Sequence, residues 1–195
     1  MTKQEVIRDS LVDMLGVEQY ALQRIEPQTR DEGLKKFPNA HVMLQRVKTV
    51  LNSHIDELEQ LLSSVNGGFE ARVKKTATFI AGSVAGIFGK LRVSEPVSKN
   101  LRDDYTLLNH AVINYGMLHT AALALDETRI ATMAEEHMAE LTPLIVELSD
   151  LIPFVLATEL ADKGKIEDST VALQAAVDAR VGYRGAWSRE VTMRT

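Results

Sequence analysis

Apolar residues recur at intervals of three and four in four long segments of the chain, which is the period of an amphipathic helix. The segments cover residues 2–29, about 40–65 (beginning after Pro38-Asn39) and about 101–125, and the fourth runs from about 126–128 to at least 152. Asn66-Gly67-Gly68 follows the second segment and is a typical helix end. The pattern therefore predicts four long helices.

The links between these helices are short, long and short. The long link covers about residues 69–100, and two helical hairpins joined by such a crossover are typical of ferritin-like connectivity. Pro153 is expected to kink or break the fourth helix, although helical residues continue towards Gly164. We expect an all-α, ferritin-like antiparallel four-helix bundle over residues 1–164, followed by a short C-terminal helix and tail over 165–195.

Polar residues interrupt the apolar stripes near the middle of the helices. Glu18 takes a stripe position in the first helix, His54 in the second and His137 in the fourth, while His119 shares a face with Tyr115 in the third. The apolar residues around these positions are Leu11, Leu15, Leu22, Val47, Leu51, Leu58, Ile130, Met133 and Leu141. A buried carboxylate costs several kcal/mol unless it is paired or bound to a cation. Because mid-helix positions of antiparallel helices meet at one level, we expect a carboxylate–imidazole cluster.

A glutamate lies one turn beyond each of the two stripe histidines. Glu57 follows His54 and Glu140 follows His137, each three residues later. A His and a Glu at that spacing can hold one metal ion from a single helix, and imidazole with carboxylate suits iron, manganese or zinc. The alternative is a buried Glu–His–Tyr network without metal, satisfied by hydrogen bonds, with both glutamates on a solvated flank.

The two hairpins also resemble each other in sequence. The order His, apolar, any residue, Glu, Leu occurs at 54–58 and again at 137–141. Tyr20 and Tyr115 align at the same offset as the acidic pairs 31–32 and 126–127. Both matches follow the same helix order, which indicates a duplicated hairpin.

The amino-acid composition of the chain argues against several classes of function. The chain has 195 residues, a net charge of −5 and no cysteine. The acidic balance argues against a nucleic-acid partner, and the absence of cysteine excludes thiolate sites and favours a cytoplasmic location. The apolar stretch at 78–89 is shorter than the roughly 20 residues that span a bilayer. With its basic flanks, it instead suggests either a packed crossover helix or a membrane-surface helix.

Several motifs together resemble bacterial ferritin-like stress proteins of the YciE/YciF type. The matching residues are Glu18, His54 with Glu57, Tyr115-Gly116, Glu135-Glu136 and Glu140-Leu141-Thr142. The resemblance implies a four-helix bundle, often dimeric, with a two-metal carboxylate site. Asn109 and Ala111 stand where such proteins carry a His-x-Glu, so Glu136 and Glu140 become candidate shifted ligands.

The sequence thus supports three functional hypotheses. The first is a ferritin-like protein that binds iron or another divalent metal through an incomplete carboxylate/histidine site in a stress response. Its candidate ligands are Glu18, His54, Glu57, His119, Glu136, His137 and Glu140. The second is a bundle without metal or catalysis that forms a homo-oligomer or binds a partner. The third is membrane-surface association through residues 78–89. No residue pattern names a substrate or a reaction.

Overall fold

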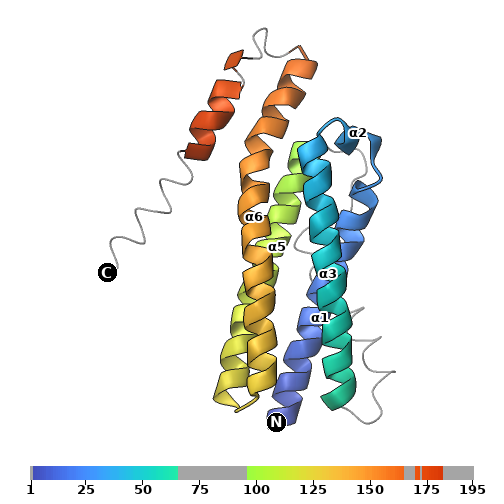
Figure 1. Ribbon diagram of the computed structural model, residues 1–195, viewed down its shortest axis with the longest axis vertical. Helices are drawn as coiled ribbons and strands as arrows, with labels where there is room; N and C mark the ends of the chain where they lie inside the picture. Colours follow the sequence, from blue (N-terminus) through green and yellow to red (C-terminus); the bar gives the residue numbers. More distant parts are fainter. Residues whose placement is uncertain (1, 66–95, 165–169, 172, 182–195) are drawn as a thin grey trace, which may run out of the picture.

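A computed structural model describes residues 2–65, 96–164, 170–171 and 173–181, and all regular secondary structure in these ranges is α-helical (Figure 1). The helices are α1 (Lys3–Gln28), α2 (Glu32–Lys35), α3 (Pro38–Val65), α5 (Val97–Ala124) and α6 (Thr128–Asp162), with a further helical stretch at 170–171 and 173–181. The predicted all-α class is confirmed. No described helix is long and apolar enough to cross a membrane.

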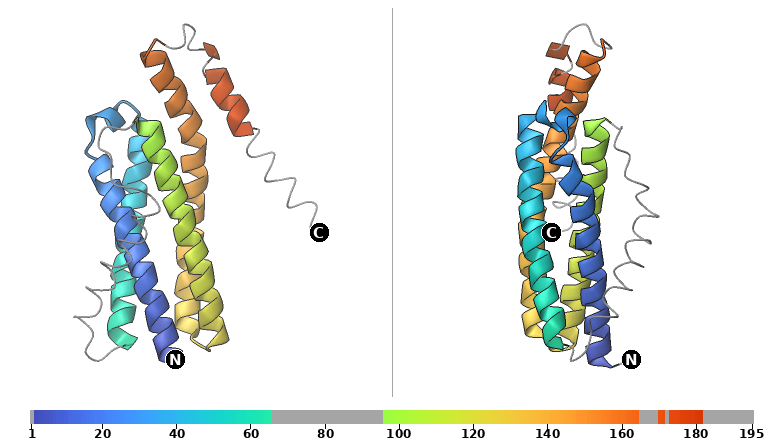
Figure 2. Two further views of the ribbon diagram at one scale, coloured as in Figure 1. Left: turned by 180° about the vertical axis from the view of Figure 1, so that it is seen from behind. Right: turned by 90° about the vertical axis from the view of Figure 1, so that its right-hand side faces the viewer.

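The four long helices lie side by side around one core (Figures 1 and 2). α1 contacts α3 and α5, and α6 contacts α5 and α3. The chain runs in opposite directions in α1 and α3, and again in α5 and α6 (Figure 1). α3 and α5 run in the same direction, because α3 ends at the end of the molecule opposite to the one where α5 begins (Figure 1). The connection between them, with the stretch at 78–89, lies outside the described residues.

Apolar side chains from all four helices form the core. Among the most deeply buried are Leu11, Leu15, Ile25, Leu44, Leu51, Leu58, Leu101, Leu107, Leu108, Leu141 and Leu148. Most of these residues belong to the stripes that the sequence pattern predicts; the exceptions are Leu44, Leu101, Leu107 and Leu148. Burial of such stripes supplies the main stabilisation of the helices, at roughly 25 cal/mol per Å² of apolar surface.

Local chemistry explains where several helices begin and end. Thr2 and Glu5 form a capping box at the start of α1, and the Asp31 carboxylate accepts the backbone N–H groups of Gly33 and Leu34 at the start of α2. Gly164, with φ of 61°, follows the last turn of α6 in the left-handed conformation that glycine tolerates.

Three details differ from the sequence-based expectation. The expected break at Pro153 is wrong, since α6 continues through both Pro143 and Pro153 to Asp162. A proline removes one backbone hydrogen bond, but core residues on both sides, such as Leu148 and Val155, hold the adjoining turns in place. α5 begins at Val97, four residues earlier than expected, and the short helix α2 was not predicted.

The stretch at 170–171 and 173–181 packs beside the end of α6 (Figure 2). Ala176 is buried with Ala157 and Phe154, and Arg180 Nε lies 3.1 Å from Asp150 Oδ1. The predicted helix at 170–181 is therefore confirmed in its described residues.

Candidate metal centre

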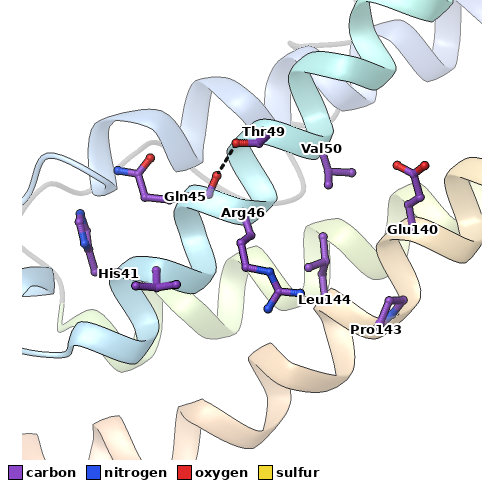
Figure 3. A pocket seen from close by; sticks show the side chains of 9 residues that line it. His41, Gln45, Arg46, Thr49, Val50, Glu140, Pro143 and Leu144 are labelled. Atoms are coloured by element: carbon purple, nitrogen blue, oxygen red, sulfur yellow. Dashed lines mark hydrogen bonds between the residues drawn. The ribbon is translucent and has the colours of Figure 1, made fainter.

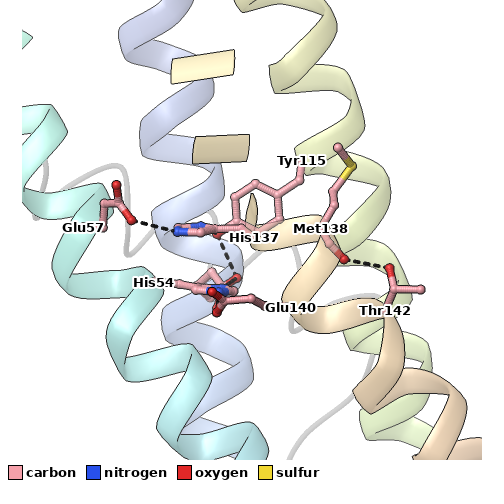
Figure 4. A network of polar contacts seen from close by, with 8 residues as sticks. His54, Glu57, Tyr115, His137, Met138, Glu140 and Thr142 are labelled. Atoms are coloured by element: carbon pink, nitrogen blue, oxygen red, sulfur yellow. Dashed lines mark hydrogen bonds and ion pairs between the residues drawn. The ribbon is translucent and has the colours of Figure 1, made fainter. Parts of the chain in front are cut away.

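Four polar side chains from four helices meet inside the core. Glu18 of α1 and Tyr115 of α5 are fully buried, and His54 of α3 and His137 of α6 are 1% and 3% exposed. Glu18, His54 and Tyr115 lie in the central parts of their helices, whereas His137 is the tenth of the 35 residues of α6. Glu18, His54 and His137 interrupt apolar stripes, as the sequence predicts. Figure 4 shows the two imidazoles beside Tyr115 between α3 and α6.

Glu18 and Tyr115 close one side of this cluster. The Tyr115 hydroxyl donates to Glu18 Oε1 at 2.9 Å, and His54 Nδ1 lies 3.2 Å from the same oxygen. His137 Nδ1 lies 2.9 Å from the Tyr115 hydroxyl oxygen. One carboxylate oxygen therefore links three helices, while the other, Glu18 Oε2, is buried and has no hydrogen-bond partner. An unpartnered buried carboxylate oxygen is costly, and it calls for a donor or a cation.

Glu57 and Glu140 form the other side of the cluster by a reciprocal exchange of partners, in which each glutamate contacts the histidine of the opposite helix. His54 Nε2 lies 3.2 Å from Glu140 Oε2, and His137 Nε2 lies 3.2 Å from Glu57 Oε2. Each histidine thus pairs with the glutamate on the opposite helix, not with the one three residues ahead on its own helix. The two rings stack with centroids 3.7 Å apart and an interplanar angle of 6°. This exchange gives the two helices equivalent roles, as the duplicated His–Glu pattern suggests.

The neighbours of the two imidazoles shift their pKa values in opposite directions. Burial lowers the pKa of His54, but hydrogen bonds and charge attraction from Glu18 and Glu140 outweigh it, so the pKa is raised overall. Burial lowers the pKa of His137 and a charged His54 lowers it further, so the pKa falls to about 4 despite Glu57. Burial, followed by Glu18, raises the pKa of Tyr115, which keeps its proton. Of the two rings, His54 therefore takes up a proton more readily than His137.

With one charged and one neutral histidine, the network holds one proton fewer than its contacts can use. Its five contacts each need a hydrogen between two electronegative atoms. Tyr115 supplies one, a charged His54 two and a neutral His137 one. With Tyr115 donating to Glu18, the His137 proton lies on Nδ1. His137 Nε2 then points a lone pair at Glu57 Oε2 across 3.2 Å. A proton on Glu57, a water molecule or a cation can satisfy these two atoms.

The structure brings together five of the seven predicted ligands. It does not bring in His119, whose Nδ1 lies 2.9 Å from the Ala131 carbonyl oxygen, or Glu136, which is exposed on α6. The five others touch in pairs and do not surround one point. Accordingly, no group of three or more His, Asp or Glu side chains in the described ranges is already positioned to hold a metal ion. Tyr115 joins the network although it was not among the predicted ligands.

A groove between α3 and α6 lies beside this centre and shares Glu140 with it (Figure 3). Its volume is about 590 Å³, and its wall includes Glu140, the partner of His54. Glu140 is 56% exposed and Glu57 is 46% exposed, whereas Glu18 is sealed on the α1 side. The centre therefore meets solvent through its two outer carboxylates.

A second buried polar cluster lies between α1 and α5 and was missed by the sequence reasoning. Asp104 is fully buried and accepts a hydrogen bond from Gln28 at 3.0 Å, and Arg24, 4% exposed, lies 3.6 Å from Asp103. Burial raises the pKa of Asp104 to about 7, although Gln28 and Arg24 act against the shift. The available signal was the spacing of Leu101, Asp104 and Leu108, which puts the acid on the buried face of α5.

Comparison with known proteins does not extend this description. Neither a scan against protein-family models nor searches of curated proteins and of solved structures find a match.

Proposed function

We propose that the chain binds a divalent transition-metal ion in the network formed by Glu18, His54, Glu57, His137 and Glu140. The observation that carries this proposal is the convergence of two stacked imidazoles with three carboxylates, in which His54 Nε2 and His137 Nε2 each lie 3.2 Å from a glutamate oxygen of the opposite helix. A metal ion can take the place of a proton in such a contact, because both atoms bind metals in their unprotonated forms.

The donor atoms fit such an ion in kind and in spacing. Nitrogen and oxygen ligands bind Zn²⁺ at about 2.0–2.2 Å, so two neighbouring ligands on one ion lie roughly 3.0–3.5 Å apart. Both Nε2–Oε2 pairs are separated by 3.2 Å. Rotation of the half-exposed Glu57 and Glu140 side chains can bring further oxygens to an ion. Imidazole and carboxylate together suit iron, manganese or zinc, and such an ion supplies Lewis-acid or redox chemistry.

The wider proposal is a ferritin-like four-helix bundle that assembles into a homo-oligomer in the cytoplasm. Two antiparallel hairpins whose inner helices α3 and α5 run the same way support this connectivity (Figure 1). The YciE/YciF-type resemblance adds a role in handling iron under stress. The ferritin-like assembly and the role under stress go beyond the helical fold itself. They rest on the pattern of Glu18, His54 and the duplicated His–Glu pairs.

Elemental analysis of the full chain, purified without chelator, tests the metal. We expect stoichiometric iron, manganese or zinc in the wild type and its loss in His137→Gln. The matched control is His119→Gln, because His119 is also a helical histidine in a hydrogen bond but lies outside the network. Circular dichroism must show that both variants fold. Wild-type protein that stays metal-free after incubation with each of the three ions would refute the proposal.

The competing function is a helical bundle that binds a partner or a second copy without metal. It is supported by the hydrogen bonds that link Glu18, Tyr115, His54 and His137, because these can satisfy the buried groups without a metal ion. It predicts a melting temperature that does not respond to divalent metal, whereas a bound ion stabilises the folded state by RT ln(1 + [L]/Kd). A metal titration followed by thermal unfolding distinguishes the two functions.

A further inference from the structure

The groove between α3 and α6 and the buried centre share one residue, Glu140. Its carboxylate lies in the groove wall and accepts from His54 Nε2 at 3.2 Å (Figures 3 and 4). Thr49 and Val50 of α3 line the same stretch of wall one turn before His54. A cation in the groove can therefore reach the Glu140 carboxylate without any movement of the helices.

The other approaches to the centre are less open. Glu18 and Tyr115 are fully buried, so α1 and α5 seal their sides of the network. Glu57 is 46% exposed but does not line the groove. Among the described residues, the Glu140 side combines an exposed carboxylate with a hollow large enough for a hydrated cation.

An ion pair neutralises the charge of Arg46, whose side chain lies in the groove wall. Arg46 of α3 donates to both carboxylate oxygens of Glu147 on α6, at 2.5 and 3.2 Å. Without Glu147, the Arg46 charge would repel an approaching cation. The groove is therefore more favourable to a cation than it would be with an unpaired Arg46.

We propose that this groove is the entry route for the divalent cation and that Glu140 is the first ligand the cation meets. This inference rests on the proposed metal-binding function. It assigns separate roles to two carboxylates that look equivalent in the network, with Glu140 acting in capture and in retention and Glu57 in retention alone.

A blocked route and a lost ligand have different kinetic signatures. An obstacle in the route raises the barrier for entry and exit alike, so association and dissociation slow by the same factor and the affinity is unchanged. A lost ligand weakens the bound state, so the affinity falls. Equilibrium and rate measurements on the same variants therefore separate the entry route from the metal site.

The test uses Co²⁺, whose visible absorption changes when nitrogen and oxygen ligands replace water, in stopped-flow mixing with the full metal-free chain. Thr49→Trp places a bulky ring in the groove at an exposed helical position. Thr106→Trp is the matched control: Thr106 is exposed on α5, away from the groove, and both hydroxyls donate to the carbonyl four residues earlier at 3.0 Å. We expect Thr49→Trp to slow association and dissociation at least about tenfold at constant stoichiometry, and Thr106→Trp to match the wild type.

Two carboxamide variants complete the test. Glu140→Gln should lower the association rate and the affinity, while Glu57→Gln should lower the affinity through faster dissociation. Glu147→Gln should slow association several-fold at low salt and less at high salt, since the unpaired Arg46 charge is then screened. Equal rates in Thr49→Trp and Thr106→Trp would overturn the entry route while leaving the metal site intact. No Co²⁺ binding by the wild type would overturn both.

Discussion

Two histidines in one stacked pair carry opposite pKa shifts because their outer neighbours differ. His54 faces carboxylates through both ring nitrogens, whereas His137 faces a carboxylate on one side and the Tyr115 phenol on the other. The first environment favours the imidazolium, and the resulting charge 3.7 Å away disfavours a second one. A proton on the pair therefore lies preferentially on His54, and His137 is the ring that more readily offers an unprotonated nitrogen to a metal ion.

Asp104 should make the protein less stable as the pH rises from about 4 to 7. The pKa of its carboxyl is raised from 3.8 to about 7 in the folded chain, mainly by burial. Between these values the folded state binds the proton and the unfolded state does not, so the free energy of unfolding falls with increasing pH and levels off above about 7. A shift of about three units corresponds to roughly 4 kcal/mol at most.

Asp104→Asn tests this linkage by urea unfolding at pH 4.5 and pH 8. The amide oxygen still accepts from Gln28, so the variant should match the wild type at the lower pH and gain about 1–4 kcal/mol at the higher. Comparison with the wild type at each pH cancels the opposite trend from His137, whose lowered pKa costs stability on acidification. Asp9→Asn, at an exposed position, should change little at either pH. Equal effects of Asp104→Asn at both pH values would contradict the shifted pKa.

At the level of elements, apolar spacing predicted the long helices well because burial of those stripes decides where the helices form. α1 matches its predicted range within a residue at each end, and α3 begins about two residues earlier than predicted. Local rules failed at Pro153, where packing on both sides of the proline outweighs one missing hydrogen bond. The early start of α5 depends on a residue distant in sequence, which periodicity does not reveal.

That distant residue is Glu159 of α6, which caps the start of α5. Pro96 makes no side-chain cap, and the Glu159 carboxylate instead accepts from the Ser98 backbone N–H at 3.2 Å and from its hydroxyl at 2.5 Å. Its negative charge also interacts favourably with the positive end of the helix dipole. Glu159→Ala should destabilise the chain by about 1–2 kcal/mol in chemical denaturation. Glu135→Ala, at an exposed position on the same helix, is the control, and equal effects would exclude the cap.

On the scale of the whole molecule, the sequence predicted which side chains meet but not how they pair. Glu18, His54 and His137 were found because a buried stripe rarely carries such residues without partners. Whether His54 reaches Glu57 or Glu140 depends on the rotation of α3 against α6, which only the packed structure fixes. The solvated flank expected as the alternative for Glu57 and Glu140 is partly correct, since both are half exposed while bound to a buried ring.

The predicted division at residues 164/165 leads to a last expectation. Within the described part of 165–195, the contacts with α6 are the small apolar cluster around Ala176 and the ion pair of Arg180 with Asp150. A partly exposed ion pair and one buried alanine contribute about 1 kcal/mol or less. A chain that ends after Gly164 should therefore unfold cooperatively, with a melting temperature within about 4 °C of the full chain.

Thermal unfolding and sedimentation of both chains test this expectation together with the proposed homo-oligomer. If the oligomer uses the long helices, the shortened chain keeps its association state; if it uses the C-terminal segment, the shortened chain becomes a monomer that still melts cooperatively. Because the centre of Glu18, His54 and His137 lies wholly within residues 1–164, metal content should be the same in both chains. A loss of cooperative unfolding on shortening would show that the four long helices do not form an independent folding unit.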